Sequence, residues 1–199
     1  GFSRAGYTFL GWNTTSNATT ALSSFNVPSG GAELYTVWAA HTYTVTYMGN
    51  GSDAGSTADS SHTYDSAENL TSNGFTRTGY SFIGWSADSG AVTADYTDGQ
   101  SVLNLTAMDD GVVTFYSVWS VNHYLITFDA NGGIGSTGPT SMVYHSSLSA
   151  PAVSKTGYTL DSWSPSVPAT VPAADTTYTA QWAANTYTVT YNGNGNDGG

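Results

Sequence analysis

The sequence predicts a mainly β chain made of small tandem domains, and three observations support this: composition, recurring aromatic motifs and Asn-Gly turns. Thr, Ser, Tyr, Val, Gly and Asn are abundant among the 199 residues, whereas Lys and Arg together number 3. β-branched and aromatic side chains favour pleated strands, and Gly and Asn favour tight turns. Because disorder requires low hydrophobicity, the aromatic content of 14% indicates a chain that folds.

The first of three motifs alternates apolar residues with Thr. This is the period-2 pattern of a strand with one buried and one exposed face. It is complete at residues 43–47 and 187–191, and the related segment 124–128, Tyr-Leu-Ile-Thr-Phe, has Leu in place of the first Thr. Each copy runs into a turn of Gly and Asn, whose residues readily adopt positive φ, at 49–51, 131–133 and 193–195. The sequence therefore predicts a strand and a tight turn at the start of each repeat.

The second motif combines a cation, a Gly-Tyr pair and a Trp, over residues 4–12, 77–85 and 155–163. Gly84, just before Trp85, predicts a bulge or a close backbone contact. All the basic residues in the chain stand two residues before the Gly-Tyr pair: Arg4, Arg77 and Lys155. We interpret them as structural cations that lie over an aromatic ring or pair with a carboxylate. The alternative, an isopeptide cross-link from Lys to Asn or Asp, is impossible for the two Arg.

The third motif is a closing strand that ends in Trp, at 34–38, 115–119 and 178–182. A domain of roughly 60 residues buries only about 60% of its unfolded surface, so its core residues must be large. We therefore expect the Trp of the repeats to be core residues rather than ligand platforms. They are Trp12, Trp38, Trp85, Trp119, Trp163 and Trp182.

Together the motifs divide the chain into repeats. Residues 43–123 and 124–186 are complete repeats, 1–42 is the C-terminal part of a repeat, and 187–199 contains the N-terminal strand of a further one. The unequal lengths of the complete repeats argue against a solenoid. Four residues, none of them Gly or Pro, separate each closing Trp from the next opening Tyr. So short a linker predicts separate domains in a stiff, extended array, cut from a longer chain.

The positions that define the repeats are expected to be structural. They are Arg4, Gly6, Tyr7, Trp12, Trp38, Tyr43, Arg77, Gly79, Tyr80, Trp85, Trp119, Tyr124, Lys155, Gly157, Tyr158, Trp163, Trp182 and Tyr187.

Charge and composition exclude several classes of function. A formal net charge of −11 lacks the cations that bind phosphate backbones, so we expect no nucleic-acid partner. No apolar run approaches the roughly 20 residues that span a bilayer, so we expect no direct membrane insertion. The absence of Cys removes thiolate metal sites, iron–sulfur clusters and Cys nucleophiles.

No motif in the sequence indicates catalysis or a cofactor. His41, His62, His123 and His145 are scattered without the spacing of a metal site or a triad. Residues 129–132, Asp-Ala-Asn-Gly, resemble the start of a calcium loop, but no Glu closes a 12-residue loop, so a turn is favoured. The acidic turns at 95–99 and 109–111 leave open whether carboxylates gather around a cation there. We expect no catalytic residue, no cofactor and no dedicated metal site.

The order of the motifs resembles the Listeria-Bacteroides repeat, also called the internalin B repeat, over essentially the entire chain. The motifs are Tyr-x-Val-Thr-Tyr/Phe with Asn-Gly-Gly, then Arg/Lys-x-Gly-Tyr-x-Phe-x-Gly-Trp, then Leu-Tyr-x-x-Trp. The chain departs from them at 160–163, Leu-Asp-Ser-Trp, and at 48–51, Met-Gly-Asn-Gly. The resemblance implies a β-grasp-like module, mainly β with a small α+β form possible, strung in arrays on bacterial surface proteins. It implies no catalytic residues.

The leading hypothesis is a non-catalytic stalk or adhesive spacer, extracellular on the cell surface or in the cell wall. Its partners would be a surface protein or glycan of a host or neighbouring cell. A second hypothesis is a self-assembling filament or surface-layer subunit, in which 187–199 of one copy completes 1–42 of another by strand addition. A third is a carbohydrate-binding module that uses exposed Tyr or Trp faces.

Overall fold

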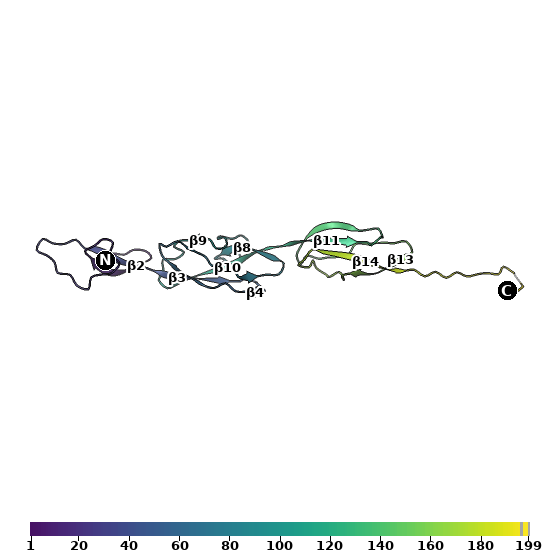
Figure 1. Cartoon of the computed structure of the whole chain (residues 1–199), viewed down its shortest axis with the longest axis horizontal. Coiled ribbons are helices and arrows are strands. Elements are labelled where there is room, and N and C mark those ends of the chain that lie inside the picture. The colour runs from purple at the N-terminus through teal and green to yellow at the C-terminus, as the bar shows by residue number, and fades with distance from the viewer. Residues whose placement is uncertain (196, 199) are drawn as a thin grey trace. The chain divides into compact units, whose positions relative to one another are not determined.

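The computed structural model describes residues 1–195, 197 and 198, and these residues form strands, turns and loops without a helix (Figure 1). The chain divides into two compact units, Gly1–Ser120 and Val121–Gly199. The prediction of a mainly β chain is confirmed. Within the described part of the chain, no helix is long and apolar enough to span a lipid bilayer.

The strands of the first unit are β1 (Tyr7–Asn13), β2 (Tyr35–Ala40), β3 (Thr42–Met48), β4 (Ala54–Gly55), β5 (Ser60–Thr63), β6 (Glu68–Asn69), β7 (Phe75–Thr76), β8 (Tyr80–Ser86), β9 (Ser101–Val102) and β10 (Gly111–Val121), whose last residue belongs to the second unit. Those of the second unit are β11 (His123–Asp129), β12 (Thr137–Val143), β13 (Tyr158–Ser164) and β14 (Thr176–Ala184).

Residues 43–123 and 124–186 build the same four-stranded sheet. The strand orders are β5-β3-β10-β8 and β12-β11-β14-β13. In each sheet the opening strand and the closing strand are parallel neighbours at the centre, and the opening strand also pairs antiparallel with an edge strand. Parallel neighbours require a long crossover, which explains why the motifs that pair lie far apart in the sequence.

Residues 1–42 contain the last two strands of the same arrangement. β1 and β2 form an antiparallel two-stranded sheet in which Tyr7 lies opposite Ala40. β13 and β14 pair in the same way, with Tyr158 opposite Ala184. The register of β1 shifts at Gly11, the position that corresponds to Gly84.

The predicted turn residues adopt the expected backbone. Asn50, Asn131 and Asn194 have φ of 46°, 49° and 43°. Gly84 has φ of 139°, and a Cβ there would lie 2.3 Å from the carbonyl oxygen of Tyr96. The close backbone contact predicted at Gly84 is confirmed, because no side chain fits in that space.

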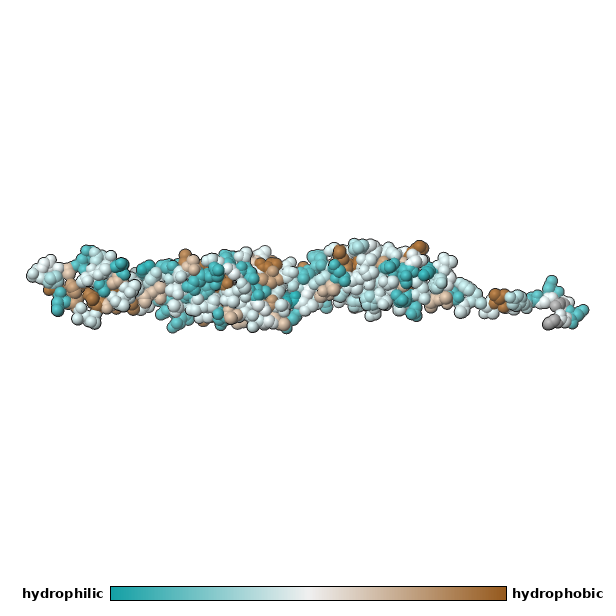
Figure 2. Space-filling view, viewed as in Figure 1, coloured by the Kyte–Doolittle hydropathy of each residue, from teal (hydrophilic) through white to brown (hydrophobic). Residues whose placement is uncertain are grey.

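Each complete repeat has its own hydrophobic core. In the first unit the core is made of Tyr43, Val45, Tyr47, Leu70, Trp85, Val102 and Phe115. In the second it is made of Ile126, Phe128, Leu148, Val171 and Tyr178. On the face seen in Figure 2, hydrophobic residues form small, separate patches among polar ones. The aromatic side chains of the motifs therefore supply most of the large buried groups.

The prediction that every Trp is a core residue is wrong for Trp12. Trp85 is 0% exposed, whereas Trp12 is 37% exposed. The ring of Trp85, on the edge strand β8, packs 4.8 Å from that of Tyr47 on the central strand β3. Among the residues that the structure describes, no third strand joins the β1–β2 sheet, and the aromatic rings beside Trp12 are those of Phe2 and Phe9. The other Trp residues are half-buried: Trp38, Trp119, Trp163 and Trp182.

The strand predicted at 187–191 is not formed. These residues pair with no strand of the described chain, and the side chains of Tyr187, Val189 and Tyr191 are exposed. A single strand gains no ladder hydrogen bonds without a neighbour, so alternation alone does not produce a sheet. The opening of a further repeat at residue 187 stays a prediction.

Candidate functional site at the repeat joint

The Asn-Gly turn of residues 43–123 is fastened to the closing strand β10. The side-chain amide of Asn50 donates to the carbonyl of Ser117 at 3.0 Å. The indole N–H of Trp119 donates to the carbonyl of Gly49, also at 3.0 Å. Two side chains thus satisfy backbone carbonyls and fix the turn.

The same fastening recurs in the second unit. Asn131 donates to the carbonyl of Ala180 at 3.0 Å, and the indole of Trp182 donates to the carbonyl of Ala130 at 2.8 Å. Lys155 Nζ adds a hydrogen bond of 3.1 Å to the carbonyl of Asn131. The closing Trp therefore acts as a donor to the turn as well as an apolar group.

The structure places each basic residue over the Tyr that stands three positions later. The distances to the ring centroid are 3.5 Å for Arg4 over Tyr7, 3.9 Å for Arg77 over Tyr80 and 4.9 Å for Lys155 over Tyr158. The intervening Gly6, Gly79 and Gly157 have φ of 74°, 76° and 80°. Positive φ, which Gly adopts without steric cost, turns the chain so that the cation faces the ring.

Residues 1–42 contact the next repeat through the joint, defined here as the contacts that 4–8 and 41 make with 64–65 and 104–107. The backbone N–H of His41 donates to the carbonyl of Gly6 at 2.8 Å. The carbonyl of His41 accepts from the N–H of Tyr64 at 2.9 Å. The linker is therefore hydrogen-bonded to the repeat before it and to the repeat after it.

The imidazole ring of His41 also contacts both repeats, in addition to the backbone of this residue. Its Nδ1 lies 2.7 Å from the carbonyl oxygen of Ala107, and its Nε2 lies 3.0 Å from Thr8 Oγ1. Because a carbonyl only accepts, Nδ1 carries a proton, and Nε2 of the neutral ring accepts from the Thr8 hydroxyl.

Linker residues of the second unit make related bonds. The N–H of Asn185 donates to the carbonyl of Gly157 at 2.9 Å, and Thr159 Oγ1 donates to Asn185 Oδ1 at 2.7 Å. The carbonyl of Asn122 accepts from the N–H of Tyr144 at 2.9 Å. His41, Asn122 and Asn185 hold the same place in their linkers, so an acceptor side chain at this position is common to all three.

Asp65 is the centre of the joint. Its carboxylate accepts from the Tyr7 hydroxyl at 2.8 Å and from the side-chain amide of Asn104 at 2.7 Å, and it pairs with Arg4 at 3.4 Å. Its backbone N–H donates to Asn104 Oδ1 at 2.6 Å. The hydrogen bond from Asn104, then that from Tyr7, holds the pKa of Asp65 below its ordinary value, with a smaller contribution from the charge of Arg4.

Replacement of Asp65 by Asn is expected to remove a pH-dependent part of the stability of the first unit. A lowered carboxyl pKa means that the carboxylate favours the folded state above the ordinary pKa of about 4, and that this contribution is lost as the pH falls through the folded-state value. Thermal unfolding of both proteins between pH 7 and pH 2 should show the wild type more stable at pH 7, with the difference closing below pH 4. A difference that stays constant with pH would contradict the assigned role.

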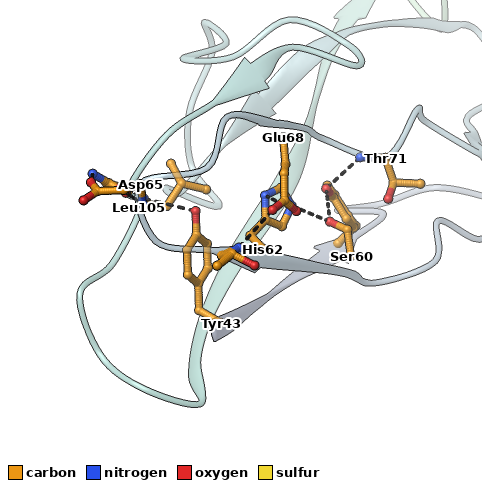
Figure 3. Close-up of polar contacts among 10 residues, drawn as sticks. Tyr43, Ser60, His62, Asp65, Glu68, Thr71 and Leu105 are labelled. Carbon is orange, nitrogen blue, oxygen red and sulfur yellow. Dashed lines mark hydrogen bonds and ion pairs between the residues drawn. The ribbon is translucent and has the colours of Figure 1, made fainter. Parts of the chain in front are cut away.

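A partly buried polar network, which the sequence did not reveal, lies beside the joint (Figure 3). His62 Nε2 lies 2.8 Å from Ser60 Oγ, and Ser60 Oγ lies 3.0 Å from the Tyr47 hydroxyl. The N–H of Thr71 donates to that hydroxyl at 2.8 Å. His62 Nδ1 lies 3.9 Å from Glu68 Oε2. The network connects the edge strand β5 with the central strand β3 and with the segment after β6.

Ser60, His62 and Glu68 place a hydroxyl, an imidazole and a carboxylate next to one another, as a catalytic triad does. Their geometry, however, suits a structural role. The His62 ring is 0% exposed and stacks on Tyr43 with centroids 5.4 Å apart. A separation of 3.9 Å is too long for a hydrogen bond from Nδ1 to Glu68. The spacing of Ser60 and His62, two residues apart on one face of a strand, is the signal that could have shown their contact.

The acidic turns are hydrogen-bonded within the fold. Asp129 Oδ1 accepts from the N–H of Asn131 at 2.8 Å, and Asp95 Oδ2 accepts from the Ser86 hydroxyl at 2.6 Å. Over residues 1–195, 197 and 198, no three His, Asp or Glu side chains gather as a group that could hold a metal ion.

The family model for the Listeria-Bacteroides repeat domain matches residues 1–37, 43–117 and 124–185. The chain belongs to this family. The matched segments leave out 38–42 and 118–123, which contain two of the four-residue linkers. The joint at His41 therefore lies between two Listeria-Bacteroides repeats rather than inside one.

Curated relatives of this Listeria-Bacteroides repeat chain come from Evansella cellulosilytica. One, named "Putative Gly-rich membrane protein", is 29% identical over 171 residues, which is 77% of this chain and 20% of the relative. Another, named "Putative membrane protein", is 27% identical over 207 residues, which is 98% of this chain and 29% of the relative. The chain thus spans less than a third of these proteins. No solved structure matches it.

Proposed function

We propose that this chain is a non-catalytic stalk segment of a bacterial surface protein, in which hydrogen-bonded joints keep successive repeats from moving freely. The observation that carries the proposal is the linker residue His41. Its N–H, its carbonyl and both ring nitrogens have partners, on the repeat before it and on the repeat after it. A linker held at four points resists bending, which is what a spacer between a cell and its target requires.

Three further observations support this role. The cores lie within single repeats, so repeats can be added without redesigning a shared interior. The family occurs in tandem copies along the chain. The relatives are named as membrane proteins and are several times longer than this chain, which agrees with a repeat segment exposed by a larger, membrane-associated protein. The partner that such a stalk would present or contact is a surface protein or a glycan of another cell.

Distance measurements across the joint test the proposal. The chain has no Cys, so two spin labels can be placed at Asn17→Cys and Ser101→Cys, on opposite sides of His41 in the first unit. Pulsed electron–electron double resonance on the full chain should give one narrow distribution of the distance between the two labels. Insertion of Gly-Gly-Ser-Gly between Ala40 and His41 should broaden it severalfold.

The matched control is the same insertion between Gly30 and Gly31, in an exposed loop of residues 1–42. It lengthens the chain equally but leaves the linker intact, so the distribution should stay narrow. A broad distribution in the uninserted chain would show freely jointed repeats and would overturn the proposed stalk.

A further inference from the structure

In residues 43–123, the carboxylate of Asp53 is bound by Thr78, the residue that follows the basic residue of the repeat. The backbone N–H of Thr78 and the Thr78 hydroxyl both donate to the side chain of Asp53. These hydrogen bonds, the backbone one first, keep the pKa of Asp53 below its ordinary value, and the positive charge of Arg77 adds to the effect. The donors of Thr78 in this corner of the repeat, the segment around Asp53 and Thr78, therefore bind a carboxylate that the chain itself supplies.

The corresponding corner of the second unit has the same donors but no carboxylate. The N–H of Asp53 donates to the carbonyl of Thr76 at 2.8 Å, and the N–H of Ile134 donates to the carbonyl of Ser154 at 2.8 Å. These bonds align the two repeats and put Ile134 in the place of Asp53. In both repeats the residue that supplies this carbonyl is followed by a basic residue and a threonine. These are Arg77 and Thr78 after Thr76, and Lys155 and Thr156 after Ser154.

A polar cavity of about 310 Å³ lies at this corner, lined by Gly132, Gly133, Ile134, Ser154, Lys155 and Thr156. Thr156 has no hydrogen-bond partner among residues 1–195, 197 and 198. Lys155 Nζ uses one N–H on the carbonyl of Asn131, which leaves two donors. The side chain of Ile134 is 75% exposed, so it does not fill the cavity.

We propose that this cavity binds the carboxylate of an acidic sugar. The amide and hydroxyl of Thr156 hold the carboxylate as those of Thr78 hold that of Asp53, and Lys155 supplies the positive charge that Arg77 supplies near Asp53. The cavity is larger than a carboxylate alone, and Ser154 with the glycine backbone supplies the polar groups that sugar hydroxyls require. The inference goes beyond the stalk role and does not depend on it.

Titration of the isotope-labelled full chain with D-glucuronic acid, at constant ionic strength and pH, tests the proposal. The amide signals of Gly132 and Thr156 should shift and saturate, whereas D-glucose should leave them unchanged. Lys155→Gln should weaken binding roughly tenfold, because a charge-assisted hydrogen bond becomes a neutral one.

Substitutions at the two equivalent positions, 134 and 53, sharpen the test. Ile134→Asp supplies the missing carboxylate from within and should abolish glucuronate binding, whereas Ile134→Val should keep it. In the other direction, Asp53→Ala should open the matching corner, so that glucuronate now shifts the amide signal of Thr78.

Three results would overturn the proposal. Equal binding of glucose would show that the carboxylate is not recognised, and undiminished binding by the Ile134→Asp protein would place the ligand elsewhere. Tighter binding of acetate or of N-acetyl-glutamate amide than of glucuronate would show that the sugar ring contributes nothing, the latter favouring an acidic peptide instead. The spin-label distances across His41 are independent of all three.

Discussion

Replacement of Trp85 by Ala should lower the free energy of unfolding of residues 43–123 by about 3–5 kcal/mol, the usual cost of deleting a buried large aromatic side chain. Trp85 is 0% exposed and its ring packs 4.8 Å from Tyr47 and 4.9 Å from Phe82. The loss removes the group that connects β3 with β8 through the core. Urea unfolding of the full chain, followed by the amide signals of β3 and β10, measures the change.

Trp12→Ala is the matched control, because Trp12 occupies the same repeat position but is 37% exposed. Its deletion removes less buried area and leaves no enclosed cavity, so we expect a smaller loss of about 2 kcal/mol. If both substitutions cost the same, burial against the ring of Tyr47 on β3 would not be what distinguishes the two Trp.

Replacement of Gly6 by Ala should open the joint. A Cβ on Gly6 would lie 2.3 Å from Cδ1 of the Tyr64 ring, and Gly6 has φ of 74°. The ring must move, and with it the hydrogen bond between Tyr64 and His41. Amide hydrogen exchange at His41 and Tyr64 should accelerate at least roughly tenfold, while the central strands β3 and β10 stay protected, because local opening is independent of global unfolding.

Gly157→Ala separates the clash from the backbone effect. Gly157 has φ of 80°, and a Cβ at this position would meet no other atom within 4 Å. Ala at such a φ costs about 1 kcal/mol from backbone strain alone, so exchange at Asn185, which donates to Gly157, should rise by less than that at His41. Equal acceleration in both proteins would show that contact with Tyr64 does not hold the joint.

Local sequence patterns predicted the central strands and the turns of the fold. The recurring motif Tyr-x-x-Thr-Tyr/Phe predicted β3 and β11, and Asn-Gly predicted the turns at Asn50 and Asn131, because both depend on a few neighbouring residues. The same reasoning failed at 187–191. There the alternation is present, but no strand among the described residues pairs with it, and a strand is stable only in a sheet.

The sequence by itself determined the repeats, the motif strands of the two complete repeats, their Asn-Gly turns and the fixed length of the linkers, since each is encoded within a short segment. The tertiary structure alone decided which linker atoms are bonded and that Asp65 meets Tyr7, 58 residues away in sequence. It also decided that Ile134 lines a polar cavity, whereas Asp53 at the same repeat position is hydrogen-bonded to Thr78. Such contacts depend on chain segments brought together by parallel strand pairing and domain docking, and no local period or propensity specifies them.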